Sequence, residues 1–238
     1  MNGYNYDKFD AEHYELVKFD GPEMGNKASD GLVVGLDGKP RQLLDFSGPF
    51  LVLEFGSITC PLFQSRRKTM ALMGQEFPDV SSVIVYVREA HPGNIISSHG
   101  DMDEKIKRGR QLRDTDGEGR EILIDKMNGD IHAAYGSYPN AVFIINKNGC
   151  VVYRSAWNNP MGTRKALRRL MSGKSVRAEA MFLPAVPTIA IATFKQAGQG
   201  SAQDFFRGLP RLAWNNLIRR NLRLLFRRSV KIDPNIGC

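Results

Sequence analysis

Hydrophobic positions along the chain fall into short runs of strand length, separated by segments in which they recur at helical spacing. Pro49–Gly56 reads PFLVLEFG, a nearly continuous apolar run that is typical of a strand covered on both faces. Val80–Pro92 begins with a second such run and ends in a polar loop. Between them, Pro61–Phe77 has apolar residues at roughly helical spacing and begins with proline, which suits a first helical position. This part of the chain therefore predicts a strand, a helix and a second strand.

Two turn signals mark hairpins on either side of this unit. Asp37-Gly38 lies between two short apolar runs, and Asn148-Gly149 lies inside the β-rich stretch Asn140–Ser155. The other predicted elements are a charged helix at Asp101–Asp114, a short strand at Glu121–Lys126, a short helix at Met127–Gly136 and a final helix at Thr163–Gly173. Strands that alternate with helices and end in an antiparallel hairpin indicate an α/β fold of the thioredoxin type. We predict a thioredoxin-like mixed sheet with flanking helices and an N-terminal β-hairpin.

Changes in composition divide the chain into four parts. Residues 1–30 form a polar lead-in with little predicted structure, and residues 31–173 hold the thioredoxin-like domain. Residues 174–204 are rich in small residues and broken by prolines, so we predict a linker there. Residues 205–238 form a basic tail, in which Leu209–Val230 predicts an amphipathic helix.

The net charge of +8 comes from one stretch of this tail. The stretch from Phe205 to Ile232 has eight basic residues and no acidic one, and the rest of the chain has equal numbers of both. The pattern suits a helix packed on the domain with solvated arginines. It equally suits an anionic membrane surface, bound through Arg219, Arg220, Arg223, Arg227 and Arg228. Binding to nucleic acid is not expected, because the tail has no recognised motif.

The chain shows no signal for secretion or membrane insertion. Its N-terminus lacks the basic start and apolar core of a signal peptide, and no run of about 18 apolar residues occurs. Cys60, Cys150 and Cys238 are few and scattered, which argues against a disulfide-stapled fold and for a reducing compartment. We therefore expect a cytoplasmic protein, with a peripheral position at a membrane as the alternative raised by the tail. The cysteines and histidines show no zinc-ligand spacing, so no metal is expected.

Cys60 is the first candidate for chemistry. It stands in LVLEFGSITCPLF, where a predicted buried strand passes into a helix. Unpaired backbone N–H groups and the dipole at a helix N-terminus favour the thiolate, and can lower a cysteine pKa from about 8.5 to ~3.5–7.5. We therefore predict a reactive thiol at Cys60 rather than a buried structural one. Cys150 lies in a hairpin and, like Cys238, keeps a structural or incidental role.

A carboxylate and two histidines form the second candidate group. Glu89 and His91 follow the second predicted strand, and open α/β sheets bind ligands at the carboxyl ends of their strands. We therefore expect Glu89 and His91 beside Cys60, with the histidine as proton donor and the carboxylate orienting it. His99, in the following loop, is a further candidate. Pro139 stands where a thioredoxin-like fold carries a cis-proline that faces the reactive cysteine.

Both stretches resemble motifs of the iodothyronine deiodinase family. Gly56–Phe63 resembles that family's GSCTU-P-x-F motif, in which selenocysteine is the nucleophile, and Tyr86–His91 resembles its YIEEAH motif. Further features match in the same order, namely His99, Leu123–Met127, Tyr135–Pro139 and the hairpin Val142–Tyr153. The resemblance covers roughly residues 31–170.

The resemblance implies a thioredoxin-fold reductive deiodinase that acts on an aromatic, iodothyronine-like substrate. It implies no bound cofactor, an external thiol reductant (a small thiol or a protein) and a homodimer. The implied catalytic residues are Cys60, Glu89, His91 and His99, and the implied substrate-binding residues are Ser57, Thr59, Tyr86 and Pro139. Cys60 would attack the iodine, and the acidic and histidine side chains would supply protons or hold the phenol.

Three departures from the family pattern bear on this interpretation. Cys60 replaces selenocysteine with a poorer nucleophile, so we expect slower turnover. Ile58 stands where the family has a cysteine that can resolve the intermediate, so Cys150, Cys238 or an external thiol must do so. Trp157 stands near the place of an arginine that meets the substrate carboxylate in some members.

Two other functions remain open at this point. A peroxiredoxin-like thiol peroxidase is supported by a cysteine that follows threonine in a redoxin-like domain, although the usual proline and arginine pattern is not evident. A non-catalytic thioredoxin-fold module that binds a membrane or a partner is the third alternative.

Overall fold

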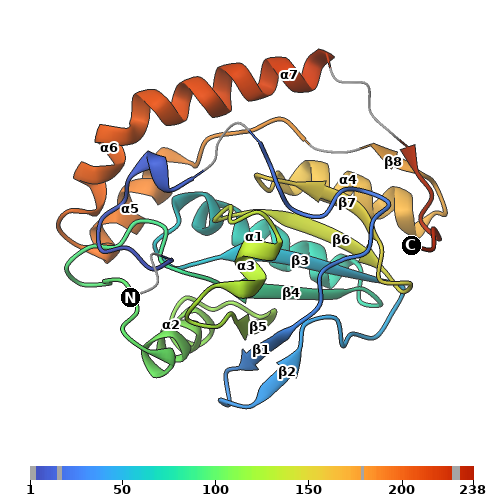
Figure 1. The fold of residues 1–238 in the computed structure, drawn as a ribbon, viewed down its shortest axis with the longest axis horizontal. Helices are drawn as coiled ribbons and strands as arrows, with labels where there is room; N and C mark the ends of the chain where they lie inside the picture. Colours follow the sequence, from blue (N-terminus) through green and yellow to red (C-terminus); the bar gives the residue numbers. More distant parts are fainter. Residues whose placement is uncertain (1–3, 15–17, 178–179, 227–230) are drawn as a thin grey trace.

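The computed structural model describes residues 4–14, 18–177, 180–226 and 231–238, and its elements follow the predicted order (Figure 1). A hairpin is followed by a strand, helix, strand, helix, strand, helix, hairpin and helix. The strands are β1 (Leu32–Gly35), β2 (Pro40–Gln42), β3 (Phe50–Gly56), β4 (Ser81–Tyr86), β5 (Glu121–Ile124), β6 (Val142–Asn146) and β7 (Val151–Ser155). The predicted α/β fold, with a mixed sheet and an N-terminal hairpin, is confirmed.

These strands form one seven-stranded sheet in the order β2-β1-β5-β4-β3-β6-β7. β3, β4 and β5 are parallel to one another. β1 pairs antiparallel with β5, and β6 pairs antiparallel with β3. Every residue of β3 is buried, which explains why its sequence is an apolar run without alternation. The parallel pairing brings the carboxyl ends of β3 and β4 to the same edge of the sheet.

Helices cover both faces of the sheet. They are α1 (Pro61–Glu76), α2 (Met102–Asp114), α3 (Asp130–Ala134) and α4 (Pro160–Met171). On one face, Met70 of α1 and Leu167 of α4 pack with Val52 of β3. On the other face, Ile131 of α3 packs with Phe55. Because successive β3 side chains point to opposite faces, this single strand contributes to both layers of the core.

The N-terminal segment is part of the domain core. It has little regular structure, as predicted, apart from the short 3-10 helix η1 (Ala11–His13). However, Tyr6, Phe9, Tyr14 and Phe19 are buried and belong to the same hydrophobic cluster as Phe55. The polar lead-in therefore supplies aromatic side chains that close one face of the sheet.

The segment predicted as a linker contains a helix, which corrects that prediction. α5 (Pro187–Ala197) begins with a proline at its first position and buries Phe194. α6 starts at Ser201, still within the predicted linker. Pro187 therefore marks where a helix begins, whereas Pro184 lies in the irregular stretch before it.

The amphipathic helix predicted in the tail is present. α6 (Ser201–Leu212), the π-helical stretch η2 (Ala213–Arg220) and α7 (Asn221–Phe226) run on as one helix along the outside of the molecule (Figure 1). Pro210 lies inside α6, and the wider π-helical turns follow it. In the described ranges no helix has the length and apolar character needed to cross a membrane.

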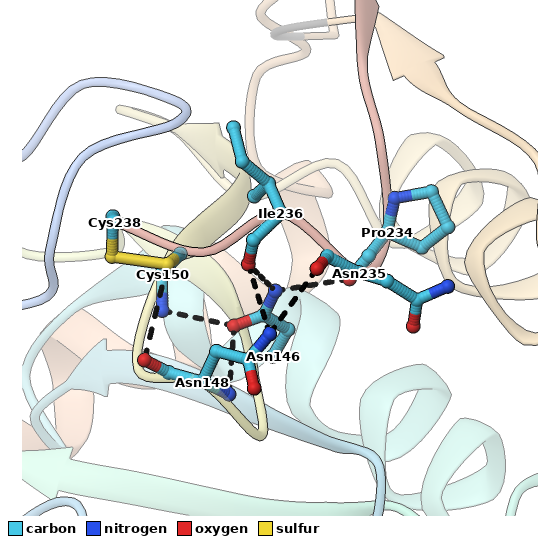
Figure 2. Close-up of a disulfide and its surroundings, with 7 residues drawn as sticks. All are labelled: Asn146, Asn148, Cys150, Pro234, Asn235, Ile236 and Cys238. Carbon is cyan, nitrogen blue, oxygen red and sulfur yellow. Dashed lines mark hydrogen bonds between the residues drawn. A yellow bond between two sulfur atoms is a disulfide. The ribbon is translucent and has the colours of Figure 1, made fainter.

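A disulfide fixes the C-terminal end of the chain. Cys238 is bonded to Cys150 at the β6–β7 turn, with 5.8 Å between their Cα atoms (Figure 2). The side chains of Asn146 and Asn148 donate to backbone carbonyls of residues 234–236, and β8 (Val176–Arg177) pairs with β9 (Lys231–Ile232). Cys150 and Cys238 thus have a structural role, as a covalent clamp that holds the C-terminal end of the chain on the β6–β7 turn. A disulfide does not fit the reducing compartment that the sparse, scattered cysteines suggested.

Candidate active site

The carboxyl ends of β3 and β4 lie side by side, as the sequence predicts. Gly56 pairs with Tyr86, and the Val87 N–H donates to the Gly56 carbonyl at 3.1 Å. Cys60 follows as the N-cap residue of α1. A Cβ atom on Gly56 would lie 2.3 Å from the ring of Phe63, so only glycine lets α1 start this close to the strand.

The Cys60 thiol is 1% exposed, and burial raises its pKa to about 11. The backbone N–H groups of Phe63 and Leu62 and the guanidinium of Arg66 favour the thiolate, but they do not offset the loss of water. The prediction of a lowered pKa is therefore wrong, although the helix N-terminus that motivated it is present. At neutral pH this thiol is protonated.

Glu89 is the centre of a buried network behind Cys60. Its Oε2 accepts from the Thr59 N–H at 3.1 Å and from the Thr59 hydroxyl at 2.6 Å, and its Oε1 accepts from the Tyr86 hydroxyl. The same tyrosine oxygen accepts from the Ile58 N–H at 3.2 Å. Nε2 of His99 lies 3.4 Å from Glu89 Oε1. The carboxylate thus holds the turn that carries Cys60, with backbone as well as side-chain contacts.

Two more hydrogen bonds tie the loop after β4 to this turn. The Ala90 N–H donates to Ser57 Oγ, and the His91 N–H donates to Thr59 Oγ1, both at 3.2 Å. Ser57 and Thr59 were predicted to contact substrate. The structure places both hydroxyls inside the protein, where they position the loop that carries His91.

A cavity of about 970 Å³ lies next to Cys60. Of the predicted site residues, Cys60, His91 and Pro139 line it, and the other five lie behind this lining. Its walls come mainly from apolar side chains of the N-terminal segment, the loops, α5, α6 and η2. Seven aromatic residues are among them: Phe9, Tyr14, Trp157, Phe182, Phe194, Phe205 and Phe206. The site is therefore an apolar, aromatic chamber with a thiol and an imidazole in its wall.

His91 is packed among three of these rings. The centroid of its ring lies 4.2 Å from that of Phe9, 5.4 Å from Phe205 and 5.6 Å from Phe194. Burial lowers its pKa to about 3, so the imidazole is neutral. Its Nδ1 is buried and has no hydrogen-bond partner among the described residues. A neutral imidazole with an unpaired nitrogen can relay a proton within a single step, but with a pKa of about 3 it does not hold one at neutral pH.

Pro139 lines the cavity as predicted, but the bond that precedes it is trans. No cis peptide bond occurs in the described part of the chain, so Pro139 does not have the cis form that thioredoxin-like folds carry at this place, an isomer that the sequence alone leaves open. The side chain nevertheless comes close to the thiol region, because β6 begins beside β3 at this edge of the sheet.

A second buried carboxylate lies next to the site, in β3. Glu54 of β3 accepts from Arg120 Nη1 at 2.6 Å, from Asn158 Nδ2 at 2.6 Å and from Asn140 Nδ2 at 2.9 Å. Asn140 Oδ1 in turn accepts from Arg66 Nη1 at 2.8 Å. These bonds connect α1 to the loops that carry Pro139 and Trp157. Sequence reasoning missed this network, although a glutamate inside the run PFLVLEFG was its signal.

Sequence reasoning also missed the cavity walls that come from the C-terminal part of the chain. Phe182 and Phe194 fall in the predicted linker, and Phe205 falls at the start of the basic tail. Hydrogen bonds fasten these walls to the site: Ser201 Oγ donates to the His91 carbonyl at 2.9 Å, and Trp157 Nε1 donates to Asn216 Oδ1 at 2.8 Å. The available signal for α5 was a run of small and apolar residues that begins with Pro187 and includes Phe194.

The two other cysteines lie far from Cys60. β3 and β6 pair Phe50 with Asn146, so the β6–β7 turn with Cys150 lies at the end of the sheet opposite Gly56. A seven-residue strand at ~3.3 Å per residue separates these ends by roughly 20 Å. The disulfide therefore cannot exchange with Cys60 in this structure.

Solved structures resemble this chain in fold. A hypothetical protein from Sinorhizobium meliloti covers 66% of the chain with a TM-score of 0.53 and 19% identity, and the chain covers 89% of it. An uncharacterized conserved protein from Geobacillus kaustophilus covers 66%, with a TM-score of 0.54, 17% identity and 87% of that chain matched. At these identities the similarity supports the fold alone.

Curated relatives carry more specific names. A thyroxine 5-deiodinase of Gallus gallus is 28% identical over 149 residues, which is 56% of each chain. A thyroxine 5-deiodinase of Aquarana catesbeiana is 32% identical over 153 residues, 59% of this chain and 56% of the relative. A type II iodothyronine deiodinase of Bos taurus is 28% identical over 156 residues, 58% of each. The matched part of the chain thus spans little more than half the length of these relatives.

The family comparison covers a larger part of the chain. The sequence model of iodothyronine deiodinase matches residues 4–170, which include the N-terminal aromatic segment, the thiol turn and the loop with His91. The family predicted from the two short motifs is confirmed over most of the domain, and the chain belongs to the iodothyronine deiodinase family.

Proposed function

We propose that this protein removes iodide reductively from an iodinated aromatic compound, with Cys60 as the nucleophile and a thiol as the electron source. Family membership supports an iodinated substrate and a redox reaction in general terms. The roles of individual residues rest on the geometry of the cavity.

The single observation that carries the proposal is that Cys60 and His91 line the same cavity. A protonated thiol and a neutral, unpaired imidazole face the same apolar space. The aromatic walls suit an iodinated ring, since they offer ring faces and edges but few polar groups. A volume of about 970 Å³ is of the size that a drug-sized ligand requires.

The first half-reaction balances with these two groups. The Cys60 sulfur attacks iodine, and the carbon–iodine bond breaks with its electron pair left on carbon. In the same step the thiol proton passes through His91, because pKa values of about 11 and about 3 disfavour a separate thiolate and imidazolium. The carbon takes the proton from His91. The products are the deiodinated ring and a sulfenyl iodide on Cys60, which has been oxidised while the carbon has been reduced.

The second half-reaction needs two external thiols. One thiol attacks the sulfenyl iodide, releases iodide and a proton, and leaves a mixed disulfide on Cys60. A second thiol attacks the mixed disulfide and restores Cys60. An external reductant is favoured because Ile58 offers no sulfur and because the Cys150–Cys238 bond lies at the other end of the sheet.

The polar network behind the cavity has a positioning role in this proposal. Glu89 fixes both Thr59 and the Tyr86 hydroxyl, and His99 lies against it, all away from the cavity lining. Burial lowers the pKa of His99, which opposes a charged role. Proton transfer to the substrate is therefore assigned to His91, and the Glu89 group keeps the thiol turn in place.

A peroxidase is less well supported. Hydrogen peroxide is small and polar, whereas apolar and aromatic side chains line this cavity and suit a larger apolar substrate.

Iodide release from an iodinated phenol, in the presence of dithiothreitol, tests the proposal directly. Wild-type protein should release iodide, Cys60→Ser should release none, and His91→Phe should lower the rate at least ~100-fold, as is usual for a lost acid–base group. Lys107→Glu, an exposed change on α2, is the matched control and should leave the rate unchanged. Loss of hydrogen peroxide without iodide release would replace the proposal by a peroxidase, and neither activity would leave a binding module.

A further inference from the structure

The α6–η2–α7 helix has one face that binds the domain. Asn216 accepts from the Trp157 indole, and Asn221 exchanges two hydrogen bonds with the backbone of Phe182. Arg220 is buried on the same side. This face explains why the helix is seated on the domain, but it uses only part of the helix circumference.

A second face consists of apolar side chains that face solvent. Phe226 is 84% exposed, Leu225 64% and Trp214 58%. The other large apolar residues exposed on this helix are Phe206, Leu209, Leu217, Ile218 and Leu222. A continuous stripe of this kind exceeds the scattered apolar residues that ordinary protein surfaces carry. It indicates that something apolar covers this side of the helix.

A third face carries positive charge. Arg219 and Arg223 are exposed and lie one turn apart beside the apolar stripe. Towards the start of the helix, Arg207 pairs with Asp204 and Arg211 pairs with Glu12. The η2–α7 half holds Arg219, Arg220 and Arg223 and no acidic residue, so the sequence concentrates net positive charge there. Arg227 and Arg228, which were predicted to take part, lie outside the described residues.

We propose that these apolar and basic faces form a docking surface for an anionic lipid bilayer. A helix lying at the interface inserts its apolar side among acyl chains, while its arginines meet anionic headgroups. Tryptophan suits this interface, since its ring is apolar and its N–H is polar. A second copy of this chain fits the surface less well. Two-fold pairing would place the same helix face of both copies against each other, and this would bring Arg219 and Arg223 of one copy near those of the other.

The docking surface adjoins the cavity. Phe206, Leu209 and Leu217 are exposed and also line the cavity that contains Cys60. Ile191 of α5 does the same. A bilayer on this face would therefore lie directly beside the apolar walls of the site.

Vesicle binding by the full chain tests the proposal. Protein is mixed with vesicles of phosphatidylcholine alone or with phosphatidylserine added, and binding is measured by flotation at low and high salt. We expect binding to the anionic vesicles, weakened by salt. Arg219→Glu/Arg223→Glu should weaken it at least ~25-fold, from about fivefold for each arginine near a lipid surface. The matched control, Lys39→Glu/Lys107→Glu, changes the same charge at exposed sites elsewhere and should bind as wild type does.

Tryptophan emission gives an independent readout of insertion. Trp157 is 5% exposed and Trp214 is 58% exposed, so a blue shift on vesicle addition reports Trp214. Trp214→Phe should still bind vesicles but lose the shift. Equal flotation of the arginine variant and its control would overturn the proposal. The proposal would also be overturned if light scattering showed that the wild type is a dimer, that Phe226→Ser dissociates this dimer, and that the wild type does not bind vesicles. That result would identify a second copy as the occupant of the surface.

Discussion

The high pKa of the Cys60 thiol leads to a quantitative prediction about its reactivity. A cysteine with a pKa of about 11 is about 0.03% thiolate near pH 7.5, whereas one with the ordinary value of about 8.5 is about 10% thiolate. Alkylation by iodoacetamide should therefore be about 300-fold slower in the native protein than in the same protein unfolded in urea. Cys60 is the free cysteine of the described chain, so the measured rate reports on this residue.

The pH profile separates thiol ionisation from access of the reagent. Slow access lowers the rate at every pH, whereas a raised pKa moves the inflection towards pH 11. Absorbance of the thiolate in the far ultraviolet supplies the same titration without a reagent, and circular dichroism shows whether the fold survives. An inflection at or below pH 8.5 in the native protein would refute the argument that burial dominates over the helix N-terminus.

Two variants of α1 test the opposing electrostatic contribution. Arg66 favours the thiolate, so Arg66→Met should move the inflection higher and slow alkylation several-fold further. Lys68→Met, an exposed change on the same helix, is the control and should leave both unchanged. The thiol also affects stability: because its pKa is raised on folding, its contribution is complete below about pH 9. About 2–3 kcal/mol of it is lost as the pH rises to 11.

Three further predictions concern stability, measured by urea unfolding. Replacing Cys150 and Cys238 by serine should lower the free energy of unfolding by about 2–5 kcal/mol, because the bond spans 88 positions and restricts the unfolded chain. Arg120→Met should cost about 3–5 kcal/mol, since it leaves the buried carboxylate of β3 without its ion pair. Burial lowers the pKa of His91 and His132 to about 3, so the stability they contribute is complete above about pH 6.5. It should fall with decreasing pH by up to about 1.4 kcal/mol per unit for each histidine.

Each of these predictions can fail separately. A double serine variant with an unchanged urea midpoint would mean that the C-terminal clamp adds no stability beyond its hydrogen bonds. An Arg120→Met variant as stable as wild type would mean that the buried glutamate takes a proton at little cost. A stability that stays constant from pH 7 to about pH 5 would mean that both imidazoles are reached by water.

The sequence predicts the sheet well because its local signals agree with one another. Asp37-Gly38 and Asn148-Gly149 each mark a hairpin, and the apolar runs before and after α1 match buried parallel strands. The placement of Cys60 beside the loop with His91 follows from strand order alone. These features depend on neighbours in sequence and on one topological rule, so they can be derived without a structure.

The parts that could not be predicted depend on contacts between distant segments. The pKa of Cys60 is set by how completely α5, α6 and the N-terminal segment enclose the cavity, and no local pattern records that enclosure. Likewise, two cysteines 88 positions apart give no sequence sign that they meet. Ser57 and Thr59 were expected to contact substrate but instead hold the loop after β4, for the same reason. The direction in which a hydroxyl points depends on the packing of the loop opposite it.

The disulfide also determines what a protease can release. Together with the backbone from position 150 to position 238, the bond closes a covalent ring that contains α5 and the α6–η2–α7 helix. A single cut anywhere in that ring opens it but leaves both pieces joined. Cleaved protein would therefore migrate as one species without reductant and as two fragments with it. Nicking of these helices and their departure from the domain are thus separate events, and only the second requires a thiol.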